Sequence, residues 1–209
     1  MIYEFTFSDS TIRQGDIFYP LPKLYTGLNK LFKFNNANEL EETTWENEKD
    51  TIPFNTITRV ETTWGIVASQ DCDAARSPSI SFFKIDTLES ISKPQLPSNP
   101  EKAIKTLLKK CREANKWFYL PIDQTIGFHE RMAIDFQNIF QIESEFLTNN
   151  IHFLRKGRLN AEADEHYRES IAQFFRRYPY DEWYPLSKDE FELYSKSSDE
   201  HIEPRNWQK

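Results

Sequence analysis

Alternating apolar and β-branched positions dominate the first half of the chain. The segment DIFYPLP at 16–22 follows a turn at Gly15 and predicts a first strand. TITRVETTWGIVAS at 56–69 and SISFFKI at 79–85 predict two more strands, which we expect to pair because only a short connection separates them. Further short strands are predicted for three later apolar runs, which occupy 117–122, 131–136 and 139–144.

Helical periodicity appears at two places. Pro100 after Asn99 is typical of a helix start, and Ile104, Leu107, Leu108 and Cys111 follow at the spacing of one apolar face, so a helix is predicted over 100–115. A second helix is predicted at about 162–178, with Ile171, Phe174 and Phe175 along one side. The polar, acidic segment 35–55 predicts a loop insertion, and residues 196–209 predict a loose charged tail.

The order of these elements is strands, helix, strands, helix, which favours an α+β fold over a doubly wound parallel sheet, because helices do not separate each strand from the next. We expect a single domain over residues 1–195. Its centre is predicted to be a small twisted antiparallel sheet or a partly open β-barrel decorated by two main helices. With 17 Phe, 9 Tyr and 5 Trp, the core is expected to be aromatic.

Composition narrows the class of protein. A net charge of -7 disfavours attraction of the whole surface to nucleic acid, although a local basic groove stays open. The five glycines form no phosphate-binding loop, and we expect no cofactor. Two distant cysteines, a start without a basic signal region and the absence of a run of about eighteen apolar residues predict a cytoplasmic protein without a membrane segment.

One dense polar cluster, Ser69-Gln70-Asp71-Cys72-Asp73, directly follows an apolar strand. If strand geometry continued, Ser69, Asp71 and Asp73 would share one face, and the two carboxylates could hold a divalent metal ion or act as acid and base. Cys72 could act as a nucleophile, with Arg76 as the cation near it in sequence. Alternatively, the two aspartates cap backbone N–H groups of the next turn, and Cys72 is a small buried apolar residue.

Basic residues gather at two places late in the chain, around Arg158 and at Arg176-Arg177. Acidic residues at the start of the second predicted helix and arginines at its end suit the helix dipole. If the two basic groups converge, they could instead meet phosphate or an acidic partner. The candidate binding residues are therefore Ser69, Gln70, Arg76, Arg158, Arg176 and Arg177.

Two sets of motifs carry a family resemblance. The opening Gly15-Asp16-Ile17 with a later strand ending in Ser69 resembles the small β-barrel of the MazF and PemK ribonuclease toxins, although Trp64-Gly65 stands where those toxins carry an Arg-Pro pair. The chain also resembles uncharacterised bacterial proteins that share four features, here Gly15-Asp16-Ile17, Ser69 to Asp73, Tyr119-Leu120-Pro121, and Arg158-Leu159 before a helix with Phe174-Phe175-Arg176. This resemblance implies a shared fold and a bacterial origin.

Three functional hypotheses follow. The first is a non-catalytic binding or accessory module of a bacterial multi-protein system, which docks to a protein partner encoded nearby; the resemblance implies a phage-defence or toxin–antitoxin setting. It predicts a buried Asp73 and an inaccessible Cys72. The second is a metal-dependent or MazF-like nuclease, with an open cleft joining Asp71 and Asp73 to arginines that steady phosphate. The third is an enzyme that depends on Cys72.

Overall fold

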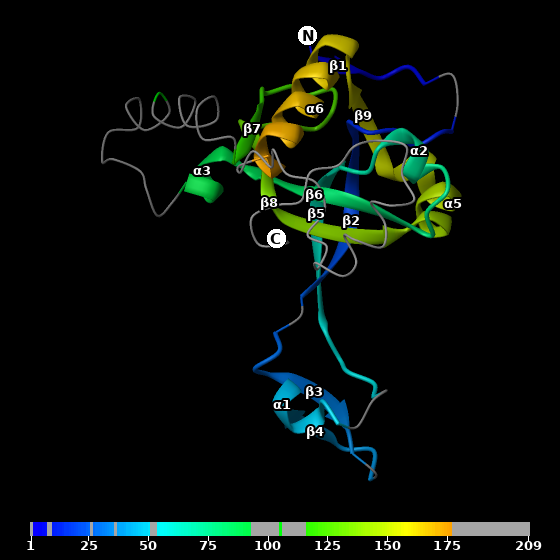
Figure 1. Ribbon diagram of the computed structural model, residues 1–209, viewed down its shortest axis with the longest axis vertical. Helices are drawn as coiled ribbons and strands as arrows, with labels where there is room; N and C mark the ends of the chain where they lie inside the picture. Colours follow the sequence, from blue (N-terminus) through cyan, green and yellow to red (C-terminus); the bar gives the residue numbers. More distant parts are fainter. Residues whose placement is uncertain are drawn as a thin grey trace, which may run out of the picture. The chain divides into compact units, whose positions relative to one another are not determined.

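A seven-stranded antiparallel sheet forms the body of the protein in the computed structural model, which describes residues 2–7, 10–25, 27–35, 37–50, 54–92, 105 and 116–176 (Figure 1). Every neighbouring pair of strands is antiparallel, and helices cover the sheet locally, so the α+β prediction is confirmed. In spatial order the strands are β1 (Tyr3–Glu4), β9 (Arg155–Leu159), β2 (Asp16–Tyr25), β5 (Arg59–Val67), β6 (Ser79–Thr87), β8 (Met132–Glu143) and β7 (Trp117–Leu120).

The sheet curls toward a partly open barrel because several of its strand pairs contain irregularities. The register shifts between Phe18 and Leu21 where β2 meets β5, and between Phe83 and Lys84 where β6 meets β8. Such bulges bend a strand and increase its twist. The two edge strands, β1 and β7, approach each other. The hydroxyl of Tyr3 in β1 donates to the carbonyl oxygen of Pro121, the residue after β7, at 2.9 Å.

The predicted pairing of 56–69 with 79–85 is confirmed, since β5 and β6 are neighbours. The two runs at 131–136 and 139–144 were predicted as separate strands, but they form the single strand β8. The gap between the two apolar runs coincides with a register shift in β8. Phe83 of β6 is paired with Ile139, whereas the next residue, Lys84, is paired with Asp135.

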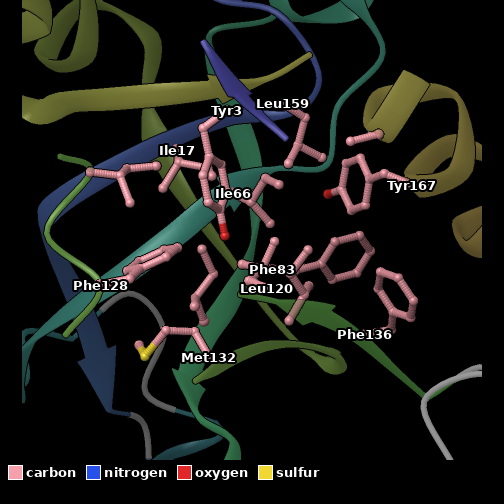
Figure 2. Packing of buried hydrophobic residues seen from close by; sticks show 14 residues of the cluster. Tyr3, Ile17, Ile66, Phe83, Leu120, Phe128, Met132, Phe136, Leu159 and Tyr167 are labelled. Carbon is pink, nitrogen blue, oxygen red and sulfur yellow. The ribbon is translucent and has the colours of Figure 1, made fainter. Parts of the chain in front are cut away.

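Helix α6 (Ala161–Phe175) covers the first of two core clusters. This helix was predicted at about 162–178. Tyr167 of α6 is fully buried, lies 6.2 Å from the ring of Phe136, and donates its hydroxyl to the carbonyl oxygen of Val67 at 3.0 Å (Figure 2). Phe174 packs against this cluster, but Phe175 is exposed. The core is therefore aromatic, as composition indicates.

A second core cluster is covered by helix α5 (Ser144–Leu154), which the sequence analysis did not predict. Leu147, Ile151 and Leu154 of α5 are buried in one cluster with Phe18, Leu21 and Phe82 of the sheet. Their spacing fits one helical face. The helix follows β8 and precedes β9 without a turn residue between them, so no loop signal marks either of its ends.

The predicted loop at 35–55 is wrong in part, because one strand of a small second sheet and a helix lie there. Strands β3 (Leu31–Phe34) and β4 (Leu40–Thr43) form an antiparallel hairpin, followed by helix α1 (Trp45–Glu48). The N-cap Thr44 accepts the N–H of Asn47 at 3.4 Å. The polar sequence LEET of β4 hid the hairpin from pattern analysis. Two further short helices are α2 (Asp71–Ala74) and α3 (Leu88–Ser92).

The chain is divided into two compact units, Met1–Phe174 and Phe175–Lys209. Three predictions lie outside the described residues: the tail at 196–209, the end of the domain at 195, and the helix at 100–115 with Cys111. Within that helix, only Lys105 is described. Among the described residues, no helix is long and apolar enough to cross a membrane.

Candidate functional site

The predicted polar cluster lies at the end of β5, but its backbone does not continue as a strand. Gln70 is the N-cap of the single helical turn α2, and the N–H groups of Asp73 and Ala74 donate to the carbonyl oxygen of Gln70. The expected alternation, with Ser69, Asp71 and Asp73 on one face, is therefore wrong. Consecutive residues of a helical turn point about 100° apart, so Asp71 and Asp73 face different surroundings.

Asp71 is a link between distant segments rather than a free carboxylate. Its Oδ1 accepts the backbone N–H of Gln14 at 2.8 Å, and its Oδ2 lies 3.3 Å from Nη2 of Arg168 on α6. The side chain of Gln14 donates in turn to the carbonyl oxygen of Ala68 at 2.8 Å. Asp71 thus joins the segment before β2 to α2 and α6, and it caps a distant N–H group instead of one in the next turn.

Arg168 and Asp164 complete this network, and the sequence analysis missed both. Arg168 Nε donates to Oδ2 of Asp164 at 2.8 Å, an (i, i+4) pair whose spacing was visible in the sequence. The other oxygen, Oδ1, is buried and has no hydrogen-bond partner in the part of the chain that the structure describes. Burial raises the pKa of Asp164, and the neighbouring Arg168 opposes that shift without cancelling it.

Cys72 and Asp73 are both exposed, so the expectation of an inaccessible thiol and a buried Asp73 is wrong. Cys72 Sγ lies 3.8 Å from Oδ1 of Asp73, at the limit of a weak sulfur hydrogen bond. A nucleophilic thiolate needs a neighbouring cation or base, and this contact offers a carboxylate. Among the described residues, no group of three or more His, Cys, Asp or Glu could hold a metal ion.

The predicted basic group around Arg158 binds a buried partner from the other end of the chain. Asp16 is fully buried, and both of its oxygens accept from Arg158, one of them from Nη2 at 3.0 Å. Arg155 lies 3.4 Å from the same carboxylate, and the N–H of Arg13 donates to it at 3.0 Å. The Gly15-Asp16 motif therefore has a structural role, which links β2 to β9.

The other predicted arginines, Arg76, Arg176 and Arg177, are not among the described contacts of Asp16. Arg176 follows the last residue of α6 and is exposed, and Arg177 lies outside the described residues. Arg76 is exposed beside the predicted cluster. The nuclease hypothesis requires a cleft that joins Asp71 and Asp73 to Arg76, Arg158 or Arg176. Asp73 and Arg76 line one depression, whereas the side chains of Asp71 and Arg158 contact other residues.

Part of the predicted cluster lies beside polar residues of strands β6 and β8. Ser69, Asp73 and Arg76 line an open depression of about 440 Å³. Four more polar residues complete its lining, namely Ser77, Ser79, Ser81 and Gln141. The sequence analysis identified the first three and missed the serines of β6 and the glutamine of β8, which only sheet pairing places beside them.

A second candidate surface lies on residues 24–60, here called the hairpin region. It carries eight of the thirteen exposed large apolar side chains among the described residues: Leu24, Tyr25, Leu28, Phe34, Leu40, Trp45, Ile57 and Val60. Single exposed apolar residues are ordinary, but such a concentration makes this region a second candidate for binding. No known family model matches the sequence, and no curated protein is significantly similar to it.

Proposed function

We propose that this protein is a non-catalytic binding module that docks a segment of a protein partner onto one face of its hairpin region. The single observation that carries the proposal is the apolar face of the β3–β4 sheet. Phe34 and Leu40 are a cross-strand pair, and they are 59% and 58% exposed. An isolated two-stranded hairpin needs packing on a hydrophobic face for stability, and Phe34 and Leu40 leave this part of the face open.

The two faces of the hairpin differ. Side chains of directly paired residues point to the same side of a sheet, so Phe32, Phe34 and Leu40 share a face with the charged Glu42. The bridge from Phe32 to Ile57 extends this face. On the opposite face, Glu48 of α1 accepts from Thr43 at 2.8 Å and from Lys33 at 2.5 Å. Helix α1 therefore covers one face and leaves the aromatic face to a partner.

A groove of about 450 Å³ continues from this face. Its apolar lining comes from Tyr25, Leu31, Phe32 and Ile57. The described residues that line it include two cations, Lys30 and Arg59, and no carboxylate.

The ion pairs of these two cations are exposed, at 2.9 Å to Glu42 for Lys30 and at 3.7 Å to Glu61 for Arg59. Exposed ion pairs contribute about 0–1 kcal/mol, so a partner can replace them. This charge pattern favours a partner segment in which large apolar side chains alternate with carboxylates. A partner encoded nearby in a bacterial phage-defence or toxin–antitoxin system is the setting that the family resemblance implies.

The test begins with capture of the partner by tagged wild-type protein from the native host, followed by purification of that partner and titration calorimetry. The double variant Phe34→Ser/Leu40→Ser removes the apolar pair, and Phe153→Ser removes a 76% exposed phenylalanine on α5 as the matched control. We expect the double variant to weaken binding at least about tenfold and the control to leave it unchanged.

Three results would overturn the proposal. One is equal binding by the double variant, and another is an equal loss in Phe153→Ser. The third is a wild-type protein that dimerises through the hairpin region, seen as a doubled mass in light scattering that the double variant abolishes. Reversal of charge in Lys30→Glu/Arg59→Glu should also weaken binding, and the titration should become less favourable at high salt.

A further inference from the structure

The depression beside α2 contains more hydrogen-bond donors than the protein itself uses. A serine hydroxyl has one proton to donate and two lone pairs to accept with. Ser69 Oγ accepts the N–H of Ser81 at 2.9 Å, and Ser77 Oγ accepts the N–H of Ser79 at 3.3 Å. Ser81 Oγ accepts from Nε2 of Gln141 at 3.4 Å. Each hydroxyl is therefore oriented by an accepted bond, and within the described chain its own proton has no acceptor.

Arg76 adds a positive charge to the same lining. Its guanidinium is exposed and, among the described residues, makes no ion pair or hydrogen bond. By contrast, Arg155, Arg158 and Arg168 are all engaged by aspartates. Arg76 therefore keeps its planar set of N–H donors available, and such a set suits the oxygens of an anion.

The position of these donors depends on the sheet. Ser79 and Ser81 alternate on β6 and so project to one side, and Ser81 faces Gln141 directly across the β6–β8 pair. Ser69 and Arg76 flank α2, whose single turn brings both ends of the β5–β6 connection to the same depression. A rigid ladder thus holds the hydroxyls, while a long side chain supplies the charge.

We infer that this depression binds a phosphate monoester of a hydroxylated molecule, the class of the sugar phosphates. A terminal phosphate offers three oxygens and up to two negative charges, which matches several hydroxyl protons and one guanidinium better than a carboxylate with two oxygens does. Asp73, on the same lining, would repel an anion but accepts a hydrogen bond from a sugar hydroxyl. The phosphate therefore lies toward Arg76 and the serines, and the hydroxyl toward Asp73.

This site is separate from the hairpin region and does not depend on partner docking there. Amide chemical shifts of the full chain, followed during titration with ribose 5-phosphate, inorganic phosphate and ribose, test it directly. We expect saturable shifts at the lining residues with ribose 5-phosphate, weaker binding of inorganic phosphate, and no binding of ribose alone.

Two variants and one matched control separate the roles. Arg76→Gln should raise the Kd for ribose 5-phosphate at least about tenfold, as expected for loss of charge-assisted hydrogen bonds. Arg131→Gln changes the net charge equally at an exposed arginine outside the lining, and it should leave the Kd unchanged. Asp73→Asn should reduce the preference for ribose 5-phosphate over inorganic phosphate.

The inference is overturned if no saturable shift appears up to about 10 mM ligand. It is also overturned if Arg131→Gln weakens binding as much as Arg76→Gln, because the effect is then one of net charge. Preference for inorganic phosphate that Asp73→Asn leaves unchanged would reject the hydroxylated ligand class.

Discussion

Replacement of Asp16 by Asn probes the buried charge cluster that links β2 to β9. Asn has nearly the same shape as Asp, but the change removes the negative charge that Arg155 and Arg158 share and replaces one of the two accepting oxygens by an N–H donor. The carboxylate is fully buried, and the side chains of Arg155 and Arg158 are only 5% and 16% exposed. Removal of one partner from a buried ion pair typically costs about 3–5 kcal/mol, because the opposite charge stays buried.

The local structure places the expected loss near the lower end of that range. Both guanidinium groups also donate to the carbonyl oxygen of Thr11, at 2.9 Å from Arg155 and 3.2 Å from Arg158, and Arg155 lies 3.9 Å from the ring centre of Phe7. These contacts remain in the variant. We therefore expect Asp16→Asn to lower the free energy of unfolding by about 3 kcal/mol.

Urea denaturation followed by tryptophan fluorescence and by circular dichroism measures this loss, provided that the two signals coincide. Asp73→Asn is the matched control, because it makes the same substitution at an exposed aspartate and should change stability by less than about 0.5 kcal/mol. A loss below about 1 kcal/mol in Asp16→Asn, the size expected for an exposed pair, would refute the claim that this cluster holds β2 and β9 together.

Two further predictions concern packing and pH. In Gly65→Ala, the new Cβ would lie 2.8 Å from Cδ1 of Leu21 and 3.0 Å from Cζ of Phe140, so we expect a loss of about 1–3 kcal/mol in urea denaturation. Gly27→Ala, where the nearest atom is 3.9 Å away, serves as the control, and equal stability of the two variants would contradict the packing argument. The third variant, Asp164→Asn, tests the raised pKa of the native Asp164 carboxyl. Above the ordinary pKa of aspartate, the native state holds more protons than the unfolded state. The free energy of unfolding of the wild type therefore falls as pH rises through the raised pKa. The stability of Asp164→Asn relative to wild type should therefore increase across that window, and a parallel pH dependence of the two proteins would disprove the shift.

Parts of the candidate site could be recognised in the sequence, and parts could not. The cluster from Ser69 to Asp73 stood out because polar residues follow an apolar strand, and three lining residues of the depression come from it or its flank. The serines of β6 and Gln141 of β8 gave no such signal, since strand pairing alone brings them there. Asp71 looked like a metal ligand in sequence, but its contacts are with Gln14 and Arg168.

The sequence by itself determined the local elements whose periodicity reports a buried face. The β-branched runs became β5 and β6, the acidic start and apolar stripe became α6, and together they predicted an α+β fold. Local patterns carry this information because a strand or helix must bury one side wherever it packs.

Only the tertiary structure decided which faces and charges meet. Asp16 pairs with arginines 139 and 142 positions away, and Tyr167 reaches the carbonyl oxygen of Val67 across 100 positions. No periodicity specifies such partners, because the choice depends on the register and curl of the whole sheet. The same holds for the hairpin region, where local polarity indicated a loop and strand pairing instead produced a sheet with one aromatic face exposed.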